Sequence, residues 1–197
     1  KLAKATVKDY PKDMEYVLPS TYPEEAEFRG QWMAPTILSP HNPDIVYHGI
    51  QYVMKSYDQG ETWTRISDDL TYNDPKKMGD ISYQTITAID ESPFRAGLIY
   101  AGTDDGRLWR SKDDGASWED IRKNPVPIRW VSRIVSSKYD MGTVYVTQTG
   151  RRDDDAEVYV WRSTDFGDSW EDISNNIPVG PVNVIREDPM DKNILYV

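Results

Sequence analysis

The chain has 197 residues, which is enough for one or two domains. It carries 33 Asp and Glu against 23 Lys and Arg, so its formal net charge is −10. Phosphate backbones and anionic lipid surfaces repel such a chain, which argues against nucleic-acid binding and membrane-surface attachment. With no Cys and two His, a disulfide framework, a thiolate zinc site and a cysteine nucleophile are excluded. No apolar run approaches the ~18 residues of a membrane-spanning helix.

Three segments of the chain align without gaps, at 53–63, 108–118 and 160–170. Each reads apolar, Met or Trp, Lys or Arg, Ser, any residue, Asp, any residue, Gly, any residue, Thr or Ser, Trp. An Ile follows three residues after each final Trp. The positions that recur are Ser56, Asp58, Gly60 and Trp63, then Ser111, Asp113, Gly115 and Trp118, then Ser163, Asp165, Gly167 and Trp170.

The repeat predicts four short strands per unit, here called A to D. Strand A alternates, as at 85–89 and 131–135, and strand B is short and apolar, as at 98–101 and 144–146. Strand C leads into the recurring Ser, and strand D begins at the recurring Trp. Four short strands in roughly 50 residues are typical of one β-propeller blade. A strand-B tyrosine marks each unit: Tyr47, Tyr100, Tyr145 and Tyr196.

We therefore predict an all-β chain that forms a partial β-propeller of about three and a half four-stranded blades. The repeats cover about 31–70, 81–122, 128–174 and 178–197. Residues 1–30 lie outside them and are expected to be an N-terminal extension or linker, or a strand that completes another blade. Since a closed propeller needs at least four blades, the remaining blades of the same protein are expected partners.

The turn between strands C and D has a chemical explanation. Its Ser and Asp can bond backbone groups of their own turn, and its Gly can adopt positive φ without strain. Its Trp is expected to cover the hairpin and pack toward a neighbouring strand. On strand C, alternation predicts that Trp109 and Trp161 point into the core between blades, and that Arg110 and Arg162 point to solvent.

The pattern Ser-x-Asp-x-Gly-x-Thr/Ser-Trp is the Asp-box, or BNR repeat. From about residue 31 to 197 the chain resembles the propellers of sialidases, xyloglucanase-like glycoside hydrolases, sortilin-type receptors and photosystem assembly factors. Segments 79–87, 129–133 and 181–189 are most similar to large exported bacterial proteins, described as sortilin-like or "glycosyl hydrolase" BNR-repeat proteins. The resemblance implies an extracytoplasmic location (periplasmic, cell-surface or secreted) and a chain that is part of a longer protein.

By analogy with such propellers, a ligand would meet the face formed by the entries to strand A and by the B–C loops. The residues that this analogy nominates are Arg29, Gln31, Trp32, Tyr83, Gln84, Arg129, Trp130 and Asn183. The third B–C loop adds an insertion at 150–155, which contributes Arg151 and Arg152. Loop insertions on one face often mark a binding surface, although a solvated charged loop explains the insertion equally well.

No residue is assigned a catalytic role. Glycoside hydrolysis usually needs two carboxylates, but in an acidic chain their abundance carries no signal. The Arg-Ile-Pro motif of sialidases is absent near Phe28-Arg29-Gly30. No cofactor is expected. Calcium is possible at Asp153, Asp154 and Asp155, which offer hard oxygen ligands without the spacing of an EF-hand loop.

These observations favour a non-catalytic binding or scaffold module of an exported bacterial protein, which engages a protein, peptide or glycan on the propeller face. Nucleic-acid binding and membrane insertion are not expected. Two alternatives stay open. One is a glycoside hydrolase, sialidase-like or xyloglucanase-like, with catalytic residues partly outside this chain. The other is an assembly factor for a membrane complex.

Overall fold

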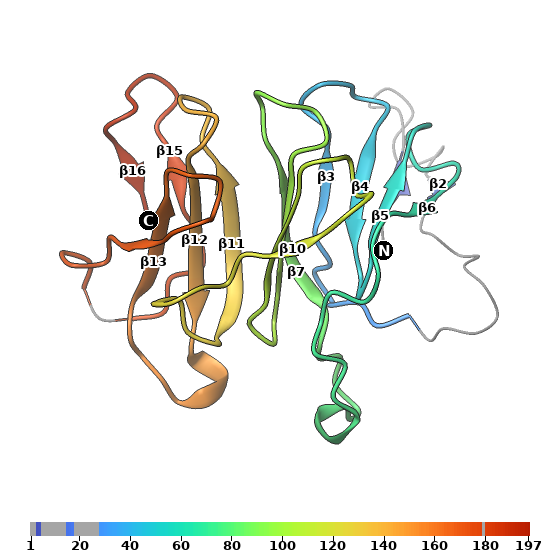
Figure 1. Ribbon diagram of the computed structural model, residues 1–197. Helices are drawn as coiled ribbons and strands as arrows, with labels where there is room; N and C mark the ends of the chain where they lie inside the picture. The colour runs from blue at the N-terminus through green and yellow to red at the C-terminus, as the bar shows by residue number, and fades with distance from the viewer. Residues whose placement is uncertain (1–2, 5–14, 18–27, 179) are drawn as a thin grey trace.

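The computed structural model describes residues 3–4, 15–17, 28–178 and 180–197. Three four-stranded antiparallel sheets follow one another along the chain, and two-stranded pairs flank them (Figure 1). The described residues contain short 3-10 turns but no α-helix. The chain is a partial β-propeller, as predicted. Nothing helical in the described part has the length and apolar character needed to cross a bilayer.

Each sheet is one blade with strands in the order A, B, C, D. Blade 1 consists of β3 (Thr36–Leu38), β4 (Val46–Gly49), β5 (Val53–Ser56) and β6 (Thr64–Arg65). Blade 2 consists of β7 (Ile86–Glu91), β8 (Ile99–Thr103), β9 (Leu108–Ser111) and β10 (Glu119–Asp120). Blade 3 consists of β11 (Trp130–Ser136), β12 (Val144–Thr149), β13 (Tyr159–Ser163) and β14 (Glu171–Asp172).

Two strand pairs flank the three blades. Strands β15 (Arg186–Glu187) and β16 (Leu195–Tyr196) form the A–B half of a fourth blade. Strands β1 (Ala3–Lys4) and β2 (Glu15–Tyr16) pair antiparallel ahead of blade 1. The other residues of the expected 1–30 extension, 1–2, 5–14 and 18–27, lie outside the described residues.

The Asp-box turn forms the hydrogen bonds that its residue types predict. In the first box, Ser56 Oγ donates to Asp58 Oδ1 at 2.7 Å and accepts from the Gly60 amide at 2.7 Å. Asp58 also accepts from the amide of Thr62 at 2.8 Å and from its hydroxyl at 2.6 Å. The other two boxes repeat this network. Gly60 has φ +95°, where a side chain would be strained.

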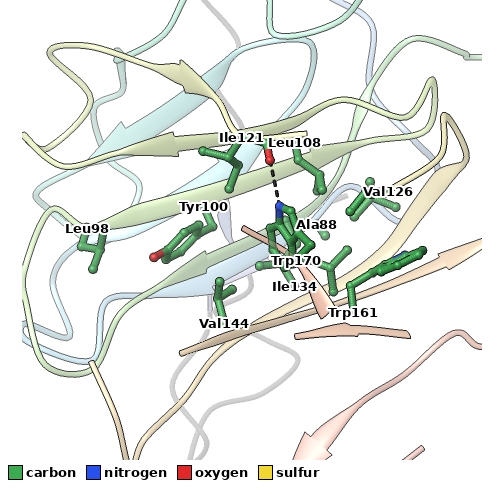
Figure 2. Close-up of a cluster of buried hydrophobic side chains, with 12 residues drawn as sticks. Ala88, Leu98, Tyr100, Leu108, Ile121, Val126, Ile134, Val144, Trp161 and Trp170 are labelled. Atoms are coloured by element: carbon green, nitrogen blue, oxygen red, sulfur yellow. Dashed lines mark hydrogen bonds between the residues drawn. The ribbon is translucent and has the colours of Figure 1, made fainter. Parts of the chain in front are cut away.

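The Trp of each box joins its blade to the preceding one. The indole N–H of Trp118 donates to the Ile66 carbonyl, and that of Trp170 to the Ile121 carbonyl, both at 2.8 Å. Figure 2 shows Trp170 and Ile121 in the buried cluster between blades 2 and 3. Trp63 donates to the Val17 carbonyl, also at 2.8 Å. Val17 follows β2 as Ile66 follows β6, so the β1–β2 pair occupies the position of strands C and D of a preceding blade.

The basic residue of the box also joins blades. Lys55, on β5, reaches the carboxylate of Asp114 in the next box at 2.6 Å. Arg110, on β9, donates to the Phe166 carbonyl at 2.8 Å and lies 3.0 Å from the Asp168 carboxylate. The prediction that Arg110 points to solvent is therefore wrong, because its side chain is only 1% exposed. A buried guanidinium needs polar partners; the next blade supplies these two, and Glu119 of its own blade supplies a third.

Replacing Trp170 with Ala should lower the free energy of unfolding by about 3–5 kcal/mol, because the ring is 7% exposed and its removal leaves a cavity. We call the contact between two neighbouring blades a seam. Trp170→Phe keeps most of the apolar packing but loses the hydrogen bond across the seam, which should lower the free energy of unfolding by about 1 kcal/mol. Urea unfolding measures the free energy of unfolding of both variants. The matched control is Trp32→Ala, since Trp32 is 93% exposed. Equal stabilities of the Trp170→Ala and Trp32→Ala chains would contradict the seam role.

Acid should weaken the Asp-box turns. Hydrogen bonds from the side chain and main chain of Thr62, and from Ser56, lower the pKa of Asp58 from 3.8 to about 2. A lowered folded-state pKa stabilises the fold above pH 3.8, and this contribution is lost as the pH falls toward 2. In the Asp58→Asn variant, the free energy of unfolding should therefore depend less on pH between pH 3.8 and pH 2 than in the unchanged protein. Parallel curves for the two chains, followed by circular dichroism, would contradict this.

Candidate functional site

The connections that enter strand A and the B–C loops lie on one side of the blades. We call this side the entry face; it carries residues 28–35, 50–52, 71–85, 103–107, 122–129 and 150–158. Two short turns project from it at the bottom of Figure 1: η1 (Pro75–Lys77), before β7, and η2 (Arg151–Asp153), after β12. Antiparallel order places these loops together, because strands A and C run away from this side and strands B and D return to it.

Arg152 stands at the centre of a group of nominated residues. Its guanidinium lies over the Trp130 ring at 4.1 Å from the ring centroid and over the Tyr83 ring at 5.6 Å. Its Nη1 atom lies 3.8 Å from Asp104 Oδ2. Blades 2 and 3 both contribute to this group, since Tyr83 precedes β7, Asp104 follows β8 and Trp130 begins β11. Stacking and the nearby carboxylate hold the arginine in place.

Asp104 is the buried hub beneath this arginine. Its Oδ1 accepts from the Thr85 amide at 2.8 Å, and its Oδ2 accepts from the Thr85 hydroxyl at 3.0 Å and from Gln31 Nε2 at 3.1 Å. Burial raises the pKa of Asp104, while the bonds from Thr85 and Gln31 oppose that rise. The carboxylate thereby connects the entry of blade 1, the entry of blade 2 and the η2 loop.

A second charged group lies beside the first. Arg129 Nε donates to Asp155 Oδ2 at 2.8 Å, and the hydroxyl of Tyr159 donates to the same oxygen at 2.7 Å. The Glu157 amide donates to Asp155 Oδ1 at 3.0 Å. The Glu157 amide, Tyr159 and Arg129 together lower the pKa of Asp155 to about 2. This carboxylate is therefore ionised and fully engaged near neutral pH.

The structure separates the nominated residues into several sets, and Arg129 belongs to the charged group at Asp155. Gln31, Tyr83, Trp130 and Arg152 gather around Asp104, and Trp32 follows Gln31 with its side chain 93% exposed. Two others are tied into the framework. Gln84 is buried and bonds the main chain of Asp74, and Arg29 pairs with Asp69.

The remaining nominated residues lie at the margins. Arg151 is exposed in η2, and Asn183 is exposed ahead of β15. The described residues contain no group of three or more His, Asp or Glu side chains placed to hold a metal ion. Calcium binding at Asp153, Asp154 and Asp155 stays a prediction.

Sequence reasoning did not identify Asp104 as a hub. Asp104-Asp105-Gly106 has the composition of a tight turn, and it does form one between β8 and β9, with Gly106 at φ +91°. Both aspartate side chains nevertheless turn inward and are buried. The partners that draw Asp104 inward are 19 and 73 residues away, so no local pattern reveals them.

A cavity of about 400 Å³ lies away from this group, between the loop after β6 and the Asp-box turn of blade 2. Trp109 and Trp118 form part of its wall. Their indole N–H groups already donate to the carbonyls of Leu70 and Ile66, at 2.6 and 2.8 Å. The cavity is therefore a feature of the seam between blades 1 and 2, and the entry face remains the candidate site.

Comparisons with known proteins agree with this fold. The family described as "Sortilin, neurotensin receptor 3" (Sortilin-Vps10) matches residues 51–194. Xyloglucanase Xgh74A of Acetivibrio thermocellus is 28% identical over 139 residues, which cover 61% of this chain and 16% of the relative. The chain therefore spans about a sixth of the length of this relative.

Solved structures show the same architecture. An ancestral GH74 enzyme has a TM-score of 0.62 at 18% identity, over 86% of this chain and 22% of that chain. The GH74 xyloglucanase of Xanthomonas campestris has a TM-score of 0.61 at 18% identity, over 81% and 25%. YCF48 bound to D1 peptide has a TM-score of 0.50 at 14% identity, over 83% and 52%. At these identities the likeness establishes the fold alone.

Replacing Asp104 with Ala should lower the free energy of unfolding by about 1–3 kcal/mol, because the buried Thr85 amide loses its acceptor and Gln31 loses one of its two acceptors. The change should also free Arg152. Asp153→Ala is the matched control, since the Asp153 side chain is 58% exposed. Thermal unfolding compares the two variants. A loss no greater than that of Asp153→Ala would show that Asp104 does not hold the face together.

Proposed function

The chain belongs to the Sortilin-Vps10 family, and from that premise we propose that it is a non-catalytic binding module that holds a peptide segment of a protein partner on the entry face. The observation that carries this proposal is the group around Arg152, together with the bare apolar side chains next to it. A peptide needs both kinds of contact: an apolar surface that it can cover and fixed polar groups that orient it.

The apolar surface begins beside Gln31. Trp32 is 93% exposed and Met33 is 89% exposed, both in the connection that enters blade 1. Ile81 and Ile128, in the connections that enter blades 2 and 3, are 73% and 51% exposed. Exposed apolar side chains that share one face of a protein often mark interaction surfaces, and Trp, Met and Arg are enriched in protein interfaces. Aliphatic side chains of this kind favour a peptide over a glycan.

The polar part of the surface is preorganised. Arg152 is held by Trp130, Tyr83 and Asp104, and its side chain keeps 40% exposure. A guanidinium that is fixed before binding loses little side-chain entropy when it pairs with a ligand carboxylate or carbonyl. This arrangement supports recognition of a peptide with a carboxylate or carbonyl group beside an apolar side chain.

The two carboxylates at the centre of the face are engaged in structural contacts. Glycoside hydrolysis uses one carboxyl group as the acid and another as the nucleophile or base. Asp104 is occupied by Thr85 and Gln31, and Asp155 by Arg129, Tyr159 and the Glu157 amide. Neither carboxylate is free for proton transfer to a substrate.

The wider assignments rest on resemblance. We place the chain in an exported bacterial protein with an extracytoplasmic location, as its sortilin-like relatives suggest. No cofactor is part of this proposal. One structural neighbour, YCF48, holds a peptide on the same fold. A sixth of Xgh74A matches this chain, so a glycan ligand, or hydrolysis by the longer protein, is the alternative outcome to be tested.

The test is selection of ligands from a random peptide library by the immobilised chain, followed by affinity measurement for the selected peptides. Trp32→Ala, Met33→Ala and Arg152→Ala should each weaken binding at least about tenfold, as expected of interface anchors. Met190→Ala is the matched control: Met190 is as exposed as Met33, at 89%, and lies in the A–B loop between β15 and β16 on the opposite side.

Xyloglucan oligosaccharides form the second arm of the test. Retention of the oligosaccharide by this chain, with no peptide selected, would overturn the peptide proposal and favour a glycan-binding module. Release of shorter sugars by the full-length protein would favour the hydrolase alternative. Peptide binding that is equally sensitive to Met190→Ala and Met33→Ala would show that the entry face is not the site.

A further inference from the structure

The cavity between blades 1 and 2, here called the seam cavity, occupies a place that is closed in the next seam. Trp109 and Trp118 line its volume of about 400 Å³ and are half-buried. At the same positions of the repeat in the seam between blades 2 and 3, Trp161 and Trp170 are only 5% and 7% exposed. Small-molecule sites measure about 300–1,000 Å³, so the seam cavity is large enough to hold a ligand.

The two seams differ in the side chains at the mouth of this space. Between blades 2 and 3, Lys123 Nζ lies 3.9 Å from Asp168 Oδ1. The equivalent positions of the seam cavity hold Asp68 and Ala116, which both line it and cannot form such a pair. Positions 67–69 carry two acidic residues where 122–124 carry two basic ones. The mouth of the seam cavity is therefore open and acidic.

Most hydrogen-bond donors of the wall are used in its own bonds. The indole N–H groups of Trp109 and Trp118 donate to the carbonyls of Leu70 and Ile66, at 2.6 and 2.8 Å. The two lining hydroxyl groups donate to the Asp113 carboxylate and to a main-chain carbonyl. Aromatic rings, carbonyl oxygens and a carboxylate remain. Such a wall suits a ligand that donates hydrogen bonds and carries positive charge.

Asp68 is the lining carboxylate that stays open to an outside cation. Asp69 is already paired with Arg29. The Asp68 side chain is 99% exposed, and Arg65 approaches it only to 4.0 Å, beyond the ~2.7–2.9 Å of a charge-assisted hydrogen bond. The Arg65 guanidinium lies over the Tyr52 ring, at 4.8 Å from the ring centroid.

We propose that the seam cavity binds a guanidinium group, as carried by an arginine side chain, which packs against Trp118 and pairs with Asp68. A guanidinium is planar, stacks on aromatic rings and presents five donors. The same seam already shows this contact, since the Arg107 guanidinium lies over the Trp109 ring at 4.1 Å from its centroid. The seam cavity is separate from the entry face, and the inference does not depend on the function proposed for that face.

The test is an NMR titration of the indole N–H signals with arginine blocked at both ends, acetyl-arginine methylamide. The signals of Trp109 and Trp118 should shift and saturate, while that of Trp32 stays unchanged. Blocked citrulline has nearly the same shape but a neutral urea group, and should bind at least about tenfold more weakly.

Free arginine forms a second arm of the titration. Tighter binding of free arginine than of blocked arginine would identify the amino acid itself as the ligand. Weaker binding of free arginine would identify an arginine side chain within a peptide.

Two variants test the mouth. Ala116→Lys places a cation opposite Asp68, with the signs of the pair in the next seam exchanged, and should weaken binding about fivefold by occupying the carboxylate. Asp68→Asn should weaken binding about threefold, which is the worth of one exposed ion pair. Asp140→Asn is the matched control, because Asp140 is exposed in the A–B loop of blade 3 and asparagine keeps the acceptor for the Gly142 amide.

Circular dichroism of each variant verifies that the fold is retained. Equal binding of blocked citrulline and blocked arginine would overturn the proposal, as would equal effects of Ala116→Lys and Asp140→Asn. Shifts confined to the signals of Trp32 and Trp130 would place the ligand on the entry face and would also overturn it.

Discussion

The architecture depends on one hydrogen bond, the donation of an indole N–H to a main-chain carbonyl of the preceding blade. A four-stranded blade has an apolar face that must be covered, but apolar packing alone does not fix the position of one sheet on another. The indole of Trp170 combines a large apolar surface with a single donor, and the Ile121 carbonyl accepts it at 2.8 Å. The same bond recurs at Trp63 and Trp118, so each blade is set against its neighbour in the same way.

The Asp-box serves this bond. Its Ser and Asp bond their own turn, which fixes the position of the Trp that follows, and its Gly lets the turn approach the neighbouring blade closely. The basic residue that recurs before each box then pairs with the turn of the next blade, as Lys55 does with Asp114. The residues that form the local turn therefore also determine how one blade contacts the next. The entry face lies at the other end of the strands, so its loops can vary without disturbing the seams.

The sequence predicts the fold well because the determinants of a blade are local. Ser, Asp, Gly and Trp recur at fixed spacing, and the strands alternate around them. Prediction fails where a partner is distant in sequence. Arg110 reads as a solvent-facing residue by alternation, yet it is buried against Asp168 of the next blade, 58 residues away. Asp104 reads as a turn residue, yet Thr85 and Gln31 draw it inward. Of the residues nominated for the site, Gln84 proves to be a framework residue because its amide bonds the main chain at Asp74.

Hydrogen exchange of the tryptophan indoles, followed by NMR, tests the seam bond most directly. The chain has seven Trp residues, and Trp32 provides an internal reference because it is 93% exposed. We expect the indole protons of Trp118 and Trp170 to exchange far more slowly than that of Trp32, because the contact between two blades must open before either proton meets water. Exchange of the Trp170 proton at the rate of Trp32 would contradict the claim that these bonds hold the blades together.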